Sequence, residues 1–286
     1  MGGLHDGTES RTVRSIMESD VQPHPHGEVR SEVLDGHLLV LTVDRVAKKN
    51  AFTPKMMGEL GAALTRLDDD PDLFAGVLTF AGDHTTAGLE MPLFFGTDDG
   101  PGAGRPTGPD APVDPFGLGR RLRKPLVTAV QGITFTVGIE IALAGDLVVA
   151  ASDARFCQLE PKRGLAPLGG ATIRYVQRAG WGNAMYHLLR ADEFGAAEAH
   201  RIGLVQEVVA PGEQVERAIA LGRELLQCAP AALAHTIANA RPALDEHEPA
   251  AIAAIPAMAA AVQATDDFGE GIASFVERRP ARFSGR

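Results

Sequence analysis

Residues 124–172 read KPLVTAVQGITFTVGIEIALAGDLVVAASDARFCQLEPKRGLAPLGGAT, and this stretch decides the fold. Leu126–Val130 is a short apolar run, which predicts a buried strand. After the glycine turn at Gly132, apolar residues recur at helical spacing as far as Ala144, and Leu147–Ala151 is a second continuous apolar run. The pattern therefore predicts strand, helix and strand in succession, as in an α/β protein.

Glu140 is the single ionisable side chain between residues 125 and 145. The helical spacing places it in the first turns of the predicted helix. Burying an unpaired carboxylate is costly, so such a group is hydrogen-bonded, has a shifted pKa, or lines a cavity where its proton is used. All three outcomes are useful to an enzyme. The alternative is a buried structural glutamate paired with Gln131 or Arg155.

A second carboxylate, Glu160, follows the strand predicted at residues 155–159. Ligand sites in open α/β layers gather at strand ends and helix N-termini, so Glu140 and Glu160 can converge on one pocket. The alternative for Glu160 is a residue at the end of a loop, bridged to Lys162 or Arg163.

The composition is that of an ordinary globular chain of 286 residues, 45% of them hydrophobic. Its 27 Lys and Arg against 37 Asp and Glu give a net charge of −10, which argues against nucleic acids and anionic membranes as general partners. Cys157 and Cys228 lack metal-ligand spacing, so we expect a cytoplasmic protein with Cys157 as a small core residue. Residues 1–27 lack the apolar core of a signal peptide and predict a flexible extension. Glu140 and the Gly and Thr breaks around it argue against a membrane span at residues 125–145.

Earlier in the chain, residues 28–43 predict a hairpin with Asp35 and Gly36 in its turn. Thr53 and Pro54 then open a helix, as the N-cap and the first helical residue.

Three polar segments are interpreted more simply. The acidic residues 68–72 predict a solvated turn, and the Gly- and Pro-rich residues 95–118 predict a long loop. The basic residues 120–124 predict a solvated helix end or, alternatively, a contact to phosphate. His84 is interpreted as a loop histidine rather than as a catalytic base.

Four ordered motifs carry a family resemblance. They are K-P-x-V-x-A-V-x-G from Lys124, G-x-E-I-A-L-A-x-D-L-V-V-A from Gly138, F-x-Q-x-E from Phe156, and G-L-x-P from Gly164. Together they resemble the crotonase (enoyl-CoA hydratase/isomerase) superfamily, and the resemblance extends over residues 28–283.

This resemblance implies a crotonase (ClpP/crotonase-like) spiral of stacked β-β-α units in the α/β class. The spiral core would span residues 28–212. A C-terminal helical region, residues 213–286, would build a homotrimer or a dimer of trimers.

The resemblance also implies a site for an acyl-CoA thioester. The main-chain N–H groups of Ala87 and Val137 would form an oxyanion hole, and Glu140 would activate water while Glu160 handles the Cα proton. Binding of substrate and CoA is expected at Arg45, Lys49, Ala51, Thr85, Ala87, Leu89 and Arg279. No metal and no separate cofactor are expected, because CoA enters as part of the substrate.

The reaction that the resemblance favours is hydration of a trans-2-enoyl-CoA. Val137 and Leu168 stand where the family usually has glycine, and Glu90 stands where it usually has aspartate. These departures leave open another crotonase reaction, namely that of an isomerase, a dehydratase or a hydrolase. A weakly active scaffold that binds CoA thioesters is the alternative from a different class.

Overall fold

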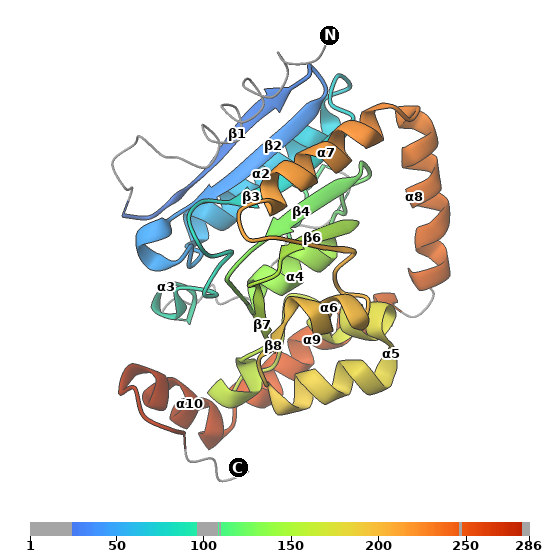
Figure 1. The fold of residues 1–286 in the computed structure, drawn as a ribbon. Helices are drawn as coiled ribbons and strands as arrows, with labels where there is room; N and C mark the ends of the chain where they lie inside the picture. The colour runs from blue at the N-terminus through green and yellow to red at the C-terminus, as the bar shows by residue number, and fades with distance from the viewer. Residues whose placement is uncertain (1–24, 96–107, 109, 246–247, 282–286) are drawn as a thin grey trace.

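The computed structural model describes residues 25–95, 108, 110–245 and 248–281 (Figure 1). Its strands are β1 (Glu28–Leu34), β2 (Leu38–Asp44), β3 (Ala75–Phe80), β4 (Leu126–Val130), β5 (Ile133–Phe135), β6 (Leu147–Ala151), β7 (Arg155–Cys157), β8 (Phe194–Gly195) and β9 (Glu207–Val209). Its α-helices are α2 (Pro54–Asp69), α3 (Met91–Phe95), α4 (Val137–Ala144), α5 (Ala171–Arg190), α6 (Ala196–Arg201), α7 (Gln214–Leu226), α8 (Pro230–Asp245), α9 (Glu248–Gln263) and α10 (Asp266–Val276). Two short 3-10 helices are η1 (Val46–Lys48) and η2 (Glu160–Arg163).

The main sheet has six strands in the order β1-β2-β3-β4-β6-β9. β1 and β2 form the predicted antiparallel hairpin, and its turn residues Asp35 and Gly36 have φ angles of 52° and 78°. Both values are positive, as the tight hairpin turn requires. The other neighbouring strands of this sheet are parallel, and β5-β7-β8 form a second, smaller sheet.

Helices cover both faces of the main sheet. Val215, Ala218 and Ile219 of α7 pack on one face, so the first helix of the predicted C-terminal region is part of the sheet's core. Side chains of α2 and α4 share the cluster on the other face. Helix α8 runs along one edge of the molecule, and α10 lies at the end opposite the β1–β2 hairpin (Figure 1).

Helix α4 lies in the centre of the molecule and carries Glu140 in its first turn, as predicted (Figure 1). Its residues Val137 to Leu143 are all buried. The turn that leads into β5 requires glycine, because Gly132 has a φ of +49° and a Cβ there would lie 2.2 Å from the Asp83 carbonyl oxygen. This turn aims α4 toward the oxyanion loop, residues 85–90.

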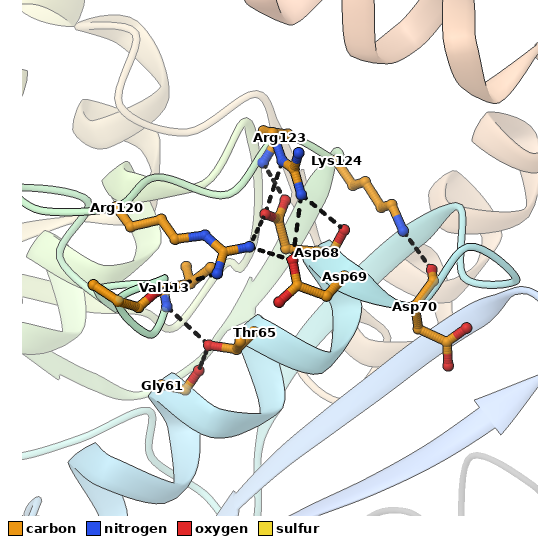
Figure 2. Close-up of polar contacts among 10 residues, drawn as sticks. Gly61, Thr65, Asp68, Asp69, Asp70, Val113, Arg120, Arg123 and Lys124 are labelled. Carbon is orange, nitrogen blue, oxygen red and sulfur yellow. Dashed lines mark hydrogen bonds and ion pairs between the residues drawn. The ribbon is translucent and has the colours of Figure 1, made fainter. Parts of the chain in front are cut away.

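The acidic segment forms a turn only at residues 70–72, and the prediction for the basic segment is wrong. Asp68 and Asp69 belong to α2 rather than to a solvated turn, and Asp68 is fully buried (Figure 2). Arg120 and Arg123 pair with these aspartates, so the basic segment is neither a solvated helix end nor a phosphate site. The aspartates at the C-terminal end of α2, which are far away in the sequence, neutralise the charge of this basic segment.

Other predictions are met in part. Helix α5 is interrupted at Gly180, where φ is +71°. Two predicted segments lie largely outside the described residues. They are the long loop, of which residues 96–107 and 109 are not described, and the extension, of which residues 1–24 are not described. Cys157 is buried, as predicted.

Within the described ranges, no helix combines the length and apolar character that a membrane span requires. The oligomeric state and the compartment remain predictions.

Candidate active site

Glu140 is buried and held by the start of α5. Its Oε1 accepts hydrogen bonds from the main-chain N–H groups of Gly169 at 2.8 Å and Ala171 at 3.2 Å. Amides at a helix N-terminus stabilise negative charge, so this setting suits a carboxylate. The alternative partners are engaged elsewhere: Gln131 donates to main-chain carbonyls, and Arg155 pairs with Glu193.

Gly169 allows this contact because it has no side chain. A Cβ at this position would lie 2.2 Å from Glu140 Oε2 and 2.7 Å from Phe116 Cδ1. The glycine therefore lets the main chain approach the carboxylate closely. Gly169 was not among the predicted site residues, although the glycine pair that it forms with Gly170 was the available signal.

Glu160 begins η2, directly after the β7 segment, and it lacks the partners that were weighed for it. Its Oε2 is buried and has no hydrogen-bond partner among the described residues, and neither Lys162 nor Arg163 forms an ion pair with it there. Burial raises the pKa of Glu160 well above its ordinary value, and the negative charge of Glu140 raises it further. The two carboxyl groups are therefore neighbours, and Glu160 keeps its proton to higher pH than an ordinary glutamate.

The oxyanion loop corrects one prediction. The N–H of Ala87 donates to the Lys49 carbonyl at 2.9 Å, so it is already occupied and is not the predicted free donor. The neighbouring bridge to Phe52 uses the Gly88 carbonyl and the Glu90 N–H. The N–H of Leu89 lies between them and has no acceptor among the described residues.

Val137 provides the second unoccupied donor. It is the first residue of α4, and its N–H has no acceptor within the described part of the chain, as is usual for the first turn of a helix. The side chains of Leu89 and Val137 belong to the same apolar cluster, which brings the oxyanion loop and α4 together. The structure thus leaves the N–H groups of Leu89 and Val137 without an acceptor among the described residues, on two segments that pack together, whereas the sequence pointed to Ala87 and Val137.

Asn50 and Thr86 hold the oxyanion loop in place, and neither role was predicted. Asn50 Oδ1 accepts from the Arg45 N–H at 2.8 Å, and its Nδ2 donates to the carbonyls of Ala81 and His84 at 2.8 Å. Thr86 Oγ1 donates to the Asn50 carbonyl at 2.8 Å. Asn50 and Thr86 are therefore structural supports of the loop.

Two predicted contacts to CoA are interior residues. The Arg45 side chain is buried, pairs with Glu90 at 2.5 Å and donates to the Ala51 carbonyl at 2.9 Å. Thr85 is buried and exchanges hydrogen bonds with the main chain of Gln131. The guanidinium and the hydroxyl are both committed to the fold, so these two predictions are not supported.

The other predicted contacts are scattered. Lys49 is exposed on the loop after η1, and Ala51 and Leu89 are half-buried beside it. Arg279 pairs with Glu270 at 2.6 Å and Glu277 at 2.5 Å, at the far end of α10. It borders a surface hollow of about 700 Å³ whose lining includes neither active-site glutamate.

Comparison with known proteins places this geometry in a family. The sequence model of the family "Enoyl-CoA hydratase/isomerase" matches residues 35–286. The chain belongs to this family, and the predictions of the family, of the crotonase fold and of a hydratase-type enzyme are confirmed.

Individual relatives and solved structures are similar to this chain over most of its length. Enoyl-CoA hydratase EchA19 of Mycobacterium tuberculosis is 33% identical over 253 residues, which are 88% of this chain and 94% of that protein. Carnitinyl-CoA dehydratase of Escherichia coli strain K12 is 32% identical over 70% of this chain and 75% of its own length. Among solved structures, a probable enoyl-CoA hydratase/isomerase from Mycobacterium abscessus has a TM-score of 0.70 at 41% identity, covering 90% of this chain and 98% of that one. Carnitinyl-CoA hydratase from Mycobacterium avium has a TM-score of 0.79 at 28% identity, covering 92% and 100%.

Proposed function

We propose that the protein hydrates a trans-2-enoyl-CoA to a 3-hydroxyacyl-CoA. The observation that carries this proposal is the pair of unlike carboxyl groups: Glu140 sits in a setting that favours its ionised form, and Glu160 in one that favours its protonated form. Addition of water across a double bond needs one group that accepts a proton and one that donates a proton. The relatives named enoyl-CoA hydratase support the same reaction.

The thioester carbonyl would lie between the N–H groups of Leu89 and Val137. Negative charge develops on this oxygen as water adds at Cβ, and two preorganised donors stabilise it by ~3–4 kcal/mol each in the transition state. The partial positive charge at the start of α4 adds to this effect. Lys49, exposed at the neighbouring loop, would face the CoA phosphates. We propose no separate cofactor, because CoA enters with the substrate.

The two glutamates would then move the protons. Glu140 takes a proton from water as the water oxygen forms its bond to Cβ. The π electrons of the double bond shift to Cα and the thioester, and Glu160 delivers its proton to Cα. The step leaves Glu140 protonated and Glu160 ionised, and exchange with solvent restores the starting state.

A second candidate is the same reversible addition of water with a different acyl group, that of carnitinyl-CoA. The carnitinyl-CoA dehydratase relative favours this candidate. The same two glutamates would serve in both directions, with their roles exchanged when water is removed. Assays with crotonyl-CoA and with carnitinyl-CoA distinguish the two acyl groups.

The test follows the ultraviolet absorbance of the conjugated thioester in crotonyl-CoA. Glu140→Gln and Glu160→Gln each remove one proton-transfer group and should lower kcat by about 10²- to 10⁴-fold while the protein stays folded. Glu32→Gln is the matched control, because this glutamate is exposed on β1, and it should behave as the wild type. Unchanged turnover in both active-site variants would contradict the proposed mechanism.

A further inference from the structure

Four buried polar atoms near Glu160 have no hydrogen-bond partner among the described residues. They are Glu160 Oε2, both amide atoms of Gln158, and the hydroxyl oxygen of Tyr175. Tyr175 is 0% exposed and Gln158 is 2% exposed. Leaving a buried polar group unpaired costs about 1–3 kcal/mol, so such groups are few in native proteins and call for an explanation.

These residues lie on segments that carry or contact the two glutamates. Gln158 lies two residues before Glu160, just after β7. Tyr175 is on α5, one turn after Ala171, whose N–H holds Glu140. The Tyr175 side chain packs in the same apolar cluster as Ile139, the residue next to Glu140, and Phe156 of β7.

Electrostatics agrees with this placement. The pKa of Tyr175 is raised well above its ordinary value, first by burial and then by the negative charges of Glu160, Cys157, Glu140 and Asp192. These charges come from η2, β7, α4 and the segment between α5 and β8. Burial also raises the pKa of Cys157 to about 11, so its thiol stays neutral near pH 7. The Tyr175 hydroxyl therefore keeps its proton and can donate a hydrogen bond. The carboxyl groups of Glu160 and Glu140 are the candidate acceptors.

We propose that Tyr175 is a positioning residue for Glu160: its hydroxyl donates a hydrogen bond to the Glu160 carboxylate once that group has given its proton to Cα. This inference rests on the proposed function. The Gln158 amide provides a second donor for the same carboxylate. A buried carboxylate that has no cation nearby needs such donors, because hydrogen bonds are then the main compensation for its lost hydration.

The proposal explains why the hydroxyl has no partner in the resting protein. While Glu160 is protonated, it needs no donor, and the hydroxyl only adds a desolvation cost. During turnover Glu160 becomes ionised, and the donor then stabilises the state that forms. A hydroxyl kept for structural reasons would instead be expected to have a permanent partner.

The test is Tyr175→Phe, which removes one oxygen and keeps the ring. We expect kcat for crotonyl-CoA to fall about 10- to 100-fold, as for loss of a hydrogen bond to a charged group, with KM within about twofold. Without the donor the ionised form of Glu160 is less favourable, so its pKa rises. The alkaline limb of the hydration pH profile, which needs protonated Glu160, should therefore move to higher pH. The melting temperature should be unchanged or higher.

Tyr186→Phe is the matched control, because Tyr186 lies on the same helix and is 57% exposed. It should leave kcat, the pH profile and the melting temperature unchanged. A Tyr175→Phe variant with wild-type kcat and pH profile would overturn the proposal. So would a variant with lower kcat and lower melting temperature but an unshifted pH profile, since that combination indicates a packing role.

An infrared titration separates this proposal from the proposed function. The difference between wild-type and Glu160→Gln spectra isolates the Glu160 carboxyl band, and its titration in the Tyr175→Phe background gives the pKa without any substrate. If crotonyl-CoA is not hydrated by the wild type, the proposed function fails, whereas a raised Glu160 pKa in Tyr175→Phe still supports the contact. An unchanged pKa overturns it.

Discussion

Asp68 and Glu160 are both carboxyl groups with buried oxygens, and their surroundings are opposite. The Asp68 side chain is 0% exposed and accepts hydrogen bonds from Arg120 Nη2 at 2.7 Å, Arg123 Nε at 2.9 Å and the Arg123 N–H at 2.7 Å (Figure 2). Glu160 has a buried oxygen with no partner among the described residues, and its nearest named charge is the negative Glu140. Burial alone therefore does not fix the state of a carboxyl group, because the charges that act on these two groups differ in sign.

The Asp68 cluster ties α2 to the segment before β4. Arg120 also pairs with Asp69 and donates to the Ala111 carbonyl, and Lys124 Nζ donates to the Asp70 carbonyl at 2.6 Å (Figure 2). Cations near the C-terminus of a helix interact favourably with its dipole. These contacts pair opposite charges, whereas at the Glu140–Glu160 pair the pKa of Glu160 is raised by burial and by the like charge of Glu140.

The largest expected effect is on the stability of the Asp68 cluster. Asp68→Asn leaves Arg120 without its buried partner charge, so we expect the free energy of unfolding to fall by about 3–5 kcal/mol. Urea unfolding at pH 7 measures this loss. Asp69→Asn, whose side chain is 51% exposed, is the control and should lose much less. Equal losses in the two variants would show that burial does not distinguish the two aspartates.

The second prediction concerns Glu160 and pH. Because its pKa is raised in the folded protein, its contribution to stability is fully present below the ordinary glutamate pKa and is lost as pH rises through the raised value. Glutamine does not ionise, so the stability of Glu160→Gln relative to the wild type should rise with pH in this window. The slope is at most about 1.4 kcal/mol per pH unit.

Chemical denaturation from acidic to alkaline pH measures this difference, with the exposed Glu32→Gln as the reference. A stability difference that does not vary with pH would mean that Glu160 ionises as an ordinary glutamate, and the contrast with Asp68 would disappear.

The smallest effect distinguishes the two arginines that hold Asp68. The Arg123 side chain is 66% exposed and that of Arg120 is 15% exposed. Solvent screens the exposed pair, so Arg123→Ala should cost about 1 kcal/mol or less, and Arg120→Ala about 1–3 kcal/mol. High salt should reduce the Arg123 effect more strongly. This ranking would support the contrast between buried and exposed ion pairs, and the reverse ranking would contradict it.

Local patterns were enough for much of the fold. The hairpin at Asp35 and Gly36, the cap of α2 at Thr53, and Glu140 in the first turn of α4 all follow from neighbouring residues. Turn conformation, capping and helical spacing depend on a few adjacent positions, so the sequence alone determines them.

Long-range contacts decided the rest. The sequence by itself determined the hairpin, the central strand–helix–strand unit with Glu140 in its helix and Glu160 after it, and the family that the chain resembles. Only the tertiary structure showed that the Ala87 N–H is occupied by Lys49, that Asp68 is buried against Arg120, and that the Tyr175 hydroxyl has no partner among the described residues. The physical reason is that hydrogen-bond partners and burial are set by residues far apart in the chain, which local propensity does not encode.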